Sequence, residues 1–272
     1  MSVNADPRKP TRILALAKQK GGVGKTTTAI NLGTGLAQSG KTCLVIDLDP
    51  QGNASTGLGL RSEDRTHTMY DALGGESRIV DVIVPTPIKG LSIAPASIDL
   101  SGIDVELVDD PHRATKLKRL IEDPTHPLAE RFDYILIDCP PSLNLLTINA
   151  MAAAHGILVP LQCEFFALEG LTQLIGTVQQ VQGALNPNLR VNGIVLTMYD
   201  QRNRLSSQVA EDVRENLGDV VFRTMVPRNV RLSEAPSHGL PVMLYDPDCA
   251  GSRAYKAMTE EFLRRETDDI AA

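Results

Sequence analysis

The segment that most constrains how this chain can fold is a glycine-rich run at residues 18–28, KQKGGVGKTTT, called the phosphate loop below. A short apolar run at 13–17 precedes it, and the stretch 26–39 that follows has apolar residues at helical spacing. A strand, a glycine-rich turn and a helix in this order are the context in which a nucleotide-binding loop is expected. The glycines allow backbone N–H groups to turn towards a triphosphate, and the start of the helix adds partial positive charge.

The phosphate loop contains two lysines for which we expect different roles. Lys25 and Thr26 stand where the pattern G-x-x-x-x-G-K-[ST] has its lysine and its hydroxyl residue. Lys25 should therefore reach the β- and γ-phosphates, and the Thr26 hydroxyl should bind Mg²⁺. The first glycine of the pattern is replaced by Gln19, and a second lysine, Lys20, stands at the head of the loop. Because one lysine is enough to bind the phosphates, we expect Lys20 to have another function.

Apolar runs that predict buried strands alternate with stretches that predict helices along most of the chain. Strands are expected at 13–17, 42–47, 91–94, 134–138, 156–160, 191–197 and 220–222. Helices are expected at 26–39, 114–121, 145–154, 168–185, 206–217 and 251–265. Near-continuous apolar strands joined by helices are typical of a parallel sheet covered on both faces. We therefore predict an α/β fold: a single doubly wound, P-loop NTPase-like domain over residues 12–266 with a mostly parallel central sheet, a flexible tail at 1–11 and a tail at 267–272.

The composition limits the possible classes of protein. Of the 272 residues, 42% are hydrophobic and 22% are charged, which is ordinary for a globular protein. The formal net charge is −6, so binding of nucleic acid would need a local basic patch. The four cysteines form no C-x-x-C pair, which argues against a zinc site or a disulfide framework. Residues 1–11 do not resemble a signal peptide and no run of eighteen apolar residues exists, so we expect a cytoplasmic location.

Two strands of the predicted sheet end in aspartates, at the edge where ligands bind such sheets. The second strand continues into DLDPQGN, where alternation places Asp47 and Asp49 on the same side, and the fourth ends at Asp138 in DCPPS. Carboxylates there can order the water shell of Mg²⁺ and orient an attacking water, and Asp138 fits the aspartate of a Walker B strand. Taken alone, DPQGN is equally compatible with a simple turn after a strand.

These motifs resemble those of the ParA/MinD family of dimerising ATPases. The loop matches the deviant Walker A signature K-G-G-x-G-K-[ST] of that family, and D-x-D-P-Q-G-N and D-x-P-P-S resemble two more of its motifs. The resemblance implies that Lys20 crosses a dimer interface to the partner's nucleotide, that Asp49 positions the hydrolytic water and that Asp47 supports the metal shell. The expected catalytic residues are Lys20, Lys25 and Asp49, and the expected metal residues are Thr26, Asp47 and Asp138. The expected phosphate contacts come from Lys20, Gly21, Gly22, Val23, Gly24, Lys25, Thr26 and Thr27.

An aromatic pair follows the fifth predicted strand. Phe165 and Phe166 stand where the similar family segment Q-C-E-Y-Y-A-L-E-G has tyrosines. Adjacent side chains point in opposite directions, so one ring could pack and the other could face a partner. A hydrophobic cluster at the start of a helix and a dimer contact are equally compatible with the sequence.

The later part of the chain is rich in arginine. Residues 190–231 contain seven arginines and no lysine against five acids, so this span has a net charge of +2. Arginines spread over loops suit a surface that grips phosphates without reading bases, although any one of them could be a solvated charge or part of an ion pair. The resemblance implies non-specific DNA binding by Arg202 and Arg231, and Arg204 and Arg228 could assist.

The turn at Pro227 and Asn229 lies within the same arginine-rich span. It resembles the segment that forms the adenine side of the family's nucleotide site. The resemblance implies that Asn229 can hydrogen-bond to the base, and both residues are therefore expected to bind the nucleotide.

The resemblance covers residues 12 to about 266 and is greatest for the short chromosomal ParA proteins of the Soj type. It implies ATP and Mg²⁺ as cofactors, an ATP-dependent homodimer that binds DNA without sequence preference, and release of DNA on hydrolysis. A ParB-type centromere-binding protein would stimulate that hydrolysis. The protein would then partition a chromosome or plasmid and associate with the nucleoid.

Three alternatives differ in surface, chemistry or cargo. A MinD-like membrane-associated ATPase would end in a basic amphipathic helix, but residues 264–272 are acidic and mostly polar, so no membrane partner is expected. A redox partner resembling the nitrogenase iron protein would need paired cysteines, and the surroundings of Cys139 and Cys163 lack that pattern. A ParA-like ATPase that positions another cargo, such as a chemoreceptor cluster, has the same chemistry and is not separated by sequence.

Overall fold

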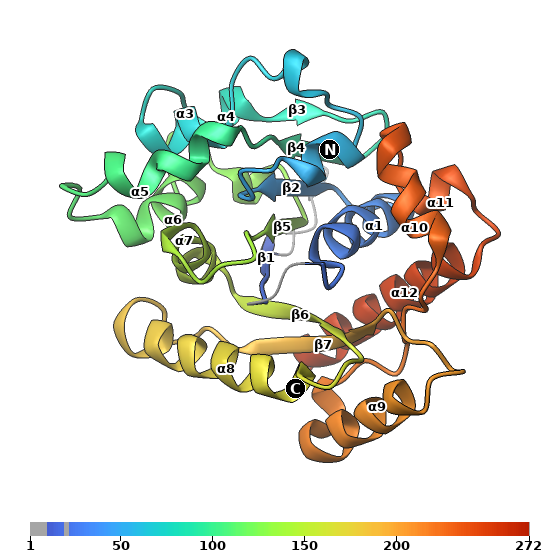
Figure 1. Ribbon diagram of the computed structural model, residues 1–272. Coiled ribbons are helices and arrows are strands. Elements are labelled where there is room, and N and C mark those ends of the chain that lie inside the picture. The colour runs from blue at the N-terminus through green and yellow to red at the C-terminus, as the bar shows by residue number, and fades with distance from the viewer. Residues whose placement is uncertain (1–9, 19–21, 272) are drawn as a thin grey trace, which may run out of the picture.

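A seven-stranded sheet organises the part of the chain described by the computed structural model, residues 10–18 and 22–271, with side chains as far as residue 267. The strand order is β3-β4-β2-β5-β1-β6-β7, and every neighbouring pair is parallel except β3 and β4 (Figure 1). The strands are β1 (Arg12–Leu16), β2 (Cys43–Asp47), β3 (Val84–Pro85), β4 (Leu91–Ala94), β5 (Tyr134–Asp138), β6 (Gly156–Gln162) and β7 (Val191–Thr197).

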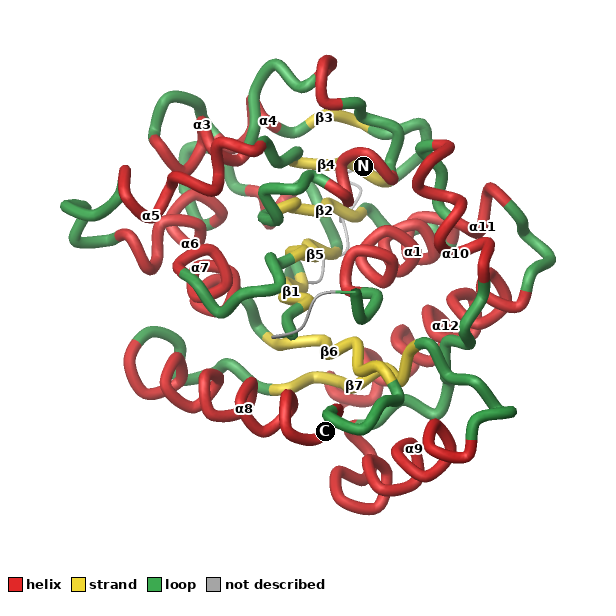
Figure 2. The backbone as a smooth tube through the Cα atoms, in the orientation of Figure 1, coloured by secondary structure: helices red, strands yellow, loops and turns green. Residues whose placement is uncertain are grey.

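Helices cover both faces of this sheet, as Figure 2 shows. They are α1 (Lys25–Gln38), α2 (Asn53–Gly57), α3 (Met69–Gly74), α4 (Ile79–Val82), α5 (Ile103–Glu106), α6 (Lys116–Ile121), α7 (Leu145–Ala153), α8 (Ala167–Ala184), α9 (Arg204–Leu217), α10 (Val230–Glu234), α11 (Val242–Tyr245) and α12 (Ala250–Ala271). Side chains of β1 alternate between two cores: Ile13 and Ala15 pack with α6, α7 and α8, whereas Leu14 and Leu16 pack with α1 and α12. The predicted doubly wound α/β fold is confirmed.

The first helix is held tightly because it lies between the sheet and α12. A Cβ added at Gly33 would come within 3.2 Å of side-chain atoms of Leu91 and Val45 in the sheet. On the opposite side, a Cβ added at Gly35 would collide with Thr259 of α12. Glycine at both positions therefore allows the close approach that fixes the start of α1, and with it the phosphate loop, against the sheet.

The prediction of a strand at 220–222 is wrong. Residues Gly218–Val220 form a 3₁₀ turn, and Val221 makes only an isolated bridge to Ile194. The remaining strand of the sheet is instead β3, a two-residue antiparallel strand at the edge. It contains Pro85, which an edge strand tolerates and a central strand does not, so neither its length nor its composition signals a strand.

The ends of the domain also differ from the prediction. The Thr11 hydroxyl, expected in the N-terminal tail, is buried and donates to the carbonyl oxygen of Phe132 at 2.5 Å. At the other end, α12 extends into the predicted tail at 267–272 and ends at Ala271. The short helices α2, α3, α4, α5, α10 and α11 were not expected, because four to six residues are too few to establish a helical period.

Candidate nucleotide site and arginine surface

The phosphate loop leaves the carboxyl end of β1 and turns sharply into α1. Gly22 and Gly24 adopt φ values of 75° and 87°, which glycine tolerates and other residues rarely do. The carbonyl of Val23 accepts a hydrogen bond of 2.8 Å from the Thr197 hydroxyl at the end of β7. Lys25, the first residue of α1, is only 6% exposed. The loop is therefore suited to let backbone N–H groups and the Lys25 ammonium face a common ligand.

Not all of the predicted phosphate contacts fall within the described residues. Lys20 and Gly21 lie outside them, so the role of Lys20 across a dimer interface stays a prediction. Gly22, Val23, Gly24, Lys25, Thr26 and Thr27 form the described turn and the first residues of α1.

Asp138 is the most unusual charged group of the site. It is fully buried at the end of β5, and neither of its carboxylate oxygens has a hydrogen-bond partner among the described residues. Burial and the charge of Asp47 hold the pKa of Asp138 well above its ordinary value, whereas Thr26 and Lys25 act in the opposite direction. A buried carboxylate without partners is costly, so this position suits a bound cation or its water shell.

Asp47 lies beside Asp138 in the register of β2 and β5 but is satisfied by the protein. One oxygen accepts from the backbone N–H of Asp49 at 3.2 Å, and the other accepts from the N–H and hydroxyl of Ser55 at 2.9 and 2.7 Å. Burial raises the pKa of Asp47 to about 6 despite these hydrogen bonds. Asp47 is therefore suited to hold the loop around the metal shell, and Asp138 is the better candidate to face the cation.

The fit to Mg²⁺ was tested on this donor set. Among the described residues, no group of three or more His, Cys, Asp or Glu side chains could hold a metal ion. Mg²⁺ usually keeps several waters and binds through one or two protein groups together with phosphate oxygens. The unpartnered Asp138 carboxylate beside the Thr26 hydroxyl fits that mode of binding, in which the nucleotide and water complete the shell.

Asp49 lies in the turn that connects β2 with α2. It is 8% exposed, and one carboxylate oxygen accepts from the N–H of Gln51 at 3.1 Å. Gly52, at φ 63°, precedes α2 and donates its N–H to the Asp49 carbonyl at 2.8 Å. The turn after the strand is therefore present as expected, and the role of Asp49 in positioning the hydrolytic water stays a prediction.

A cavity of about 240 Å³ joins the phosphate loop to the predicted adenine side. Gly24 and Thr27 line one end, and Pro227 and Asn229 line the other. The Asn229 side-chain oxygen accepts from the N–H of Arg231 at 2.9 Å and so caps α10. Its amide nitrogen is the atom that remains to donate to a base.

Three residues that support the site were missed from the sequence. Ser55 holds Asp47, Thr197 holds the carbonyl of Val23, and Arg65 binds the loop after Asp49. Ser55 and Arg65 belong to no motif recognised in the sequence, and Thr197, which begins the segment TMYDQ, is 174 residues away from its partner. Only the position of Thr197 at the carboxyl end of a predicted strand could have indicated a place near the ligand.

Four exposed arginines, called the arginine surface below, lie around the loop after β7 and the start of α10: Arg202, Arg204, Arg228 and Arg231. Arg202 makes a two-pronged ion pair with Asp200, with both distances at 3.1 Å, and the nearby charge of Arg228 helps to lower the pKa of that aspartate. Arg231 contacts Glu234 at 2.7 Å and Asp246 at 3.3 Å. Within the described part of the chain, Arg204 and Arg228 have no ion pair.

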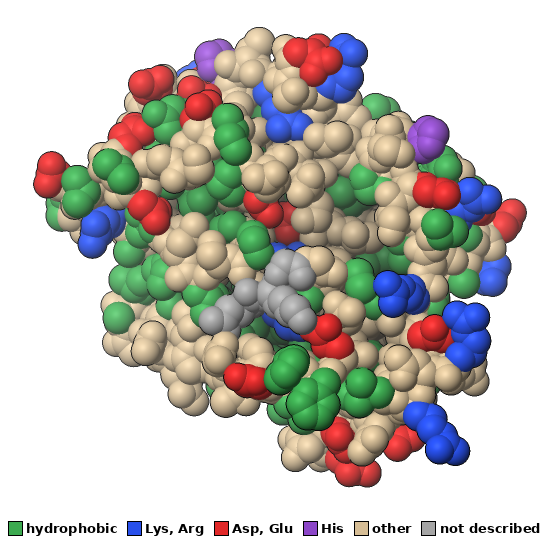
Figure 3. Space-filling view, viewed as in Figure 1, with side chains coloured by type: hydrophobic (Ala, Val, Ile, Leu, Met, Phe, Trp, Pro, Cys, Tyr) green, Lys and Arg blue, Asp and Glu red, His purple; other side chains and the backbone are tan. Residues whose placement is uncertain are grey.

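The arginines of the 190–231 span do not form one surface. Arg190 and Arg223 line a separate groove of about 700 Å³ at the amino end of β7, together with Arg264 and Arg265. The net charge of +2 counted along the span therefore combines two separate surfaces, because the two ends of β7 face opposite edges of the sheet, and DNA binding by the four named arginines stays a prediction. In Figure 3, the basic side chains around α9, α10 and α11 alternate with acidic ones.

The aromatic pair after β6 is exposed in full. Phe165 and Phe166 are 73% and 60% exposed, and their rings meet edge to face at 5.1 Å. Neither ring is buried in the protein; the two rings form a small cluster just before α8, and a dimer contact stays a prediction. Leu168, at the start of α8, is also exposed. This apolar surface is open to a partner.

The cysteines considered for a redox cluster are inside the protein. Cys139 is fully buried and Cys163 is 7% exposed. Burial raises the pKa of the Cys163 thiol to about 11 and that of the Cys139 thiol further.

Among the described residues, no helix combines the length and apolar character needed to cross a membrane.

Comparison with known proteins agrees with this geometry. Residues 11–191 match the family model described as an AAA domain. The chain is 57% identical over 263 residues to the chromosome partitioning protein ParA of Caulobacter vibrioides, covering 95% of this chain and 96% of that protein. It is 48% identical to the sporulation initiation inhibitor protein Soj of Bacillus subtilis, covering 92% and 97%.

One solved structure with the same fold is of an enzyme whose name differs from those of the partitioning proteins. The crystal structure of cobyrinic acid a,c-diamide synthase from Mycobacterium smegmatis, with bound ADP and magnesium, matches with a TM-score of 0.81 at 35% identity. The match covers 94% of this chain and 96% of that one. The higher identity to the partitioning proteins gives those relatives the greater weight, and both comparisons fit a site for a nucleotide and magnesium.

Proposed function

Since the chain belongs to the ParA/Soj family of chromosome-partitioning proteins, we propose that it is an ATPase that partitions DNA through an ATP-dependent dimer. The observation that carries the proposal is the cradle at the carboxyl edge of β1, β2 and β5. There, the Thr26 hydroxyl and the buried Lys25 both act on the pKa of the buried, unpartnered Asp138 carboxylate, and Gly24 and Thr27 of the same loop line the cavity that reaches Asn229. This edge, with the phosphate loop, Asp47, Asp49 and Asp138, is called the nucleotide edge below.

The proposed reaction is the hydrolysis of ATP to ADP and phosphate. Lys25 and the loop N–H groups bind and orient the phosphates, and Asp49 orients the attacking water in line with the γ-phosphate. Thr26 and the Asp138 carboxylate would hold Mg²⁺, which would supply positive charge against the negative charge that develops on the phosphates. The hydrogen bonds from Ser55 to Asp47 hold the segment between β2 and α2 in place.

The proposed dimer joins two nucleotide edges. Lys20 would reach across to the partner's nucleotide, and the exposed Phe165 and Phe166 lie after β6 on the carboxyl side of the sheet. Two arginine surfaces would then act on one duplex, so that weak contacts add up. Release would follow hydrolysis stimulated by a ParB-type partner, with the protein located on the nucleoid in the cytoplasm.

Binding to a random-sequence DNA duplex tests this proposal. The full chain is titrated with ATP, with ADP and without nucleotide at several salt concentrations. The proposal predicts binding with ATP alone, with an affinity that falls steeply as salt rises. Equal binding in all three states, or none in any, would contradict the DNA function. Recovery of a chemotaxis adaptor instead of a centromere-binding protein in a pull-down would favour a ParA-like ATPase with another cargo.

A further inference from the structure

We propose that Arg65 is a positioning residue for hydrolysis: it fixes the turn that carries Asp49 by binding the Gly52 carbonyl at the end of that turn and tying it to the backbone of Leu60 and Ala96. The inference rests on the proposed ATPase function and adds a residue to it. Arg65 follows the short 3₁₀ turn Ser62–Asp64 and is half-buried. It touches neither the phosphate loop nor the adenine cavity in any described contact, so its effect would pass through the loop that it holds.

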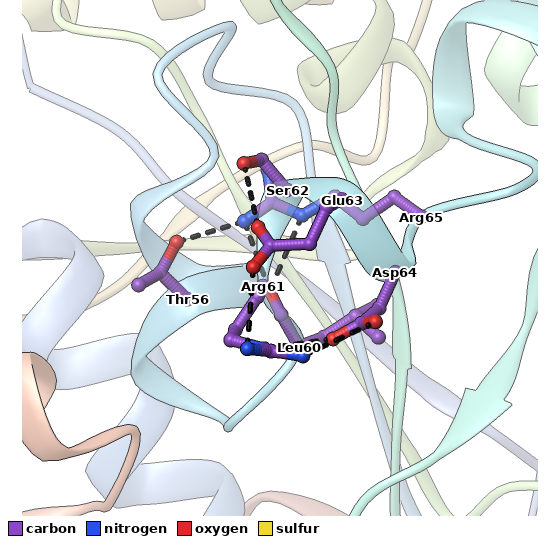
Figure 4. A network of polar contacts seen from close by, with 7 residues as sticks. All are labelled: Thr56, Leu60, Arg61, Ser62, Glu63, Asp64 and Arg65. Atoms are coloured by element: carbon purple, nitrogen blue, oxygen red, sulfur yellow. Dashed lines mark hydrogen bonds and ion pairs between the residues drawn. The ribbon is translucent and has the colours of Figure 1, made fainter.

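The guanidinium of Arg65 uses its donors on backbone carbonyls and one hydroxyl rather than on a carboxylate. Its acceptors are the carbonyl oxygens of Gly52 (3.1 Å), Leu60 (3.0 Å) and Ala96 (3.0 Å) and the hydroxyl oxygen of Thr56 (2.8 Å). Figure 4 shows the contacts with Thr56 and Leu60. A planar guanidinium with several fixed donors suits this geometry, and a lysine ammonium would reach fewer of these acceptors.

The contact with Gly52 connects Arg65 to the predicted catalytic carboxylate. Gly52 is three residues after Asp49 and closes the turn through its N–H bond to the Asp49 carbonyl. The Arg65 guanidinium lies so close to Gly52 that a Cβ added there would collide with it. The Arg65 guanidinium therefore restricts the position of the turn, and the direction of the Asp49 side chain depends on this contact.

The contact with Ala96 connects the same guanidinium to the metal side of the site. The N–H of Ala96 donates to the Ser55 hydroxyl at 3.2 Å, and that hydroxyl donates to Asp47 at 2.7 Å. Arg65 binds the carbonyl of the same residue, so Ala96 is held from both directions. One side chain thus couples the Asp49 turn to the Asp47 network, without contact with the nucleotide site itself.

Arg61 provides a matched control in the same loop. Its side chain is 68% exposed and, among the described residues, forms ion pairs only with the neighbouring exposed Glu63 and Asp64 (Figure 4). Such exposed pairs contribute little to stability. Replacing Arg61 removes the same charge from nearly the same place in the chain, but leaves the Asp49 turn unchanged.

The experiment compares Mg²⁺-ATP affinity with the single-turnover rate of hydrolysis in the full chain. The variants are Arg65→Gln, Arg65→Lys, Arg61→Gln and Asp49→Ala, with wild type as reference. We expect Arg65→Gln to keep the affinity within about threefold and to lower the rate about 10-fold, because a small misplacement of a catalytic group is costly in rate. Arg65→Lys should stay close to Arg65→Gln, and Arg61→Gln should match wild type.

Thr56→Val gives a second route to the same conclusion if Arg65→Gln does not fold. It removes one acceptor of Arg65, so a smaller loss of rate with unchanged affinity is expected. Wild-type rates in both Arg65→Gln and Thr56→Val, or an equal loss of affinity and rate, would overturn the positioning role. A wild-type protein that binds ATP but never hydrolyses it would instead overturn the proposed ATPase function.

Discussion

The nucleotide edge and the arginine surface place their charges in opposite ways. At the nucleotide edge, Asp138 is completely buried and has no hydrogen-bond partner among the described residues. On the arginine surface, Arg202 is 91% exposed and is already paired with Asp200. A buried unpaired carboxylate is maintained only at a cost, whereas an exposed ion pair costs and contributes little. The first arrangement points to a ligand by itself, and the second does not.

Nucleotide binding and DNA binding, the two parts of the proposed function, are therefore supported by different kinds of observation. The residues proposed for the nucleotide edge come from one chain, apart from the predicted contact of Lys20 across the dimer. On the arginine surface, Arg204 and Arg228 have no ion pair with any described residue, and the surface would gain strength when a second copy doubles it. DNA binding should therefore respond to changes in pairing and dimerisation, and ATP binding should respond to the loss of single buried groups.

The largest effect is expected for Lys25→Ala. The ammonium is buried at the start of α1, and losing one partner of a buried charge pair costs roughly 2–5 kcal/mol. ATP affinity, measured by calorimetric titration, should fall about 30-fold or more, because about 2 kcal/mol corresponds to about 30-fold in affinity. Affinity within a few-fold of wild type would show that the phosphate loop does not bind the triphosphate as described.

A smaller effect is expected when one arginine is removed from the surface. Arg202→Ala should weaken ATP-dependent DNA binding several-fold and reduce the slope of log affinity against log salt by about 1. Fluorescence anisotropy with a labelled duplex measures both. Arg223→Ala is the control, because Arg223 lines the groove at the other end of β7. Equal losses of DNA affinity in the two variants would mean that the arginines at both ends of β7 bind DNA as one surface.

The smallest effect is expected when the partner of Arg202 is neutralised. Asp200→Asn should raise DNA affinity about threefold, because a phosphate no longer has to displace the aspartate. Glu211→Gln, an equal change of charge on α9 at a residue without an ion pair in the described chain, should raise it less. The same DNA titration compares the two. An equal increase in both variants would mean that only net charge matters.

Much of the nucleotide edge was predictable because each of its motifs is contiguous and follows a strand. The phosphate loop after β1, Asp47 and Asp49 after β2 and Asp138 at the end of β5 all lie where the sequence placed them. Parallel strands bring such residues to one edge without any knowledge of packing. The fold followed from the same pattern, since central strands are apolar throughout.

The rest depended on contacts between distant segments. Arg65 and Thr197 act on backbone atoms far away in the sequence, and a single arginine or threonine carries no local signal of such a role. The net charge of residues 190–231 did not describe one surface, because the charge was counted along the chain and not in space. The strand at 220–222 failed because Val221 makes one bridge to Ile194 and no ladder.

The most direct test of the central claim is the Mg²⁺ dependence of ATP binding in wild type and in Asp138→Asn. Asparagine keeps the shape of the side chain but removes the unpartnered charge. Mg²⁺ should strengthen ATP binding in wild type, and the variant should lose most of this gain, about 10-fold. Asp133→Asn, a change just before the opposite end of β5, should behave as wild type. An Asp138→Asn protein with the full wild-type response to Mg²⁺ would contradict the account.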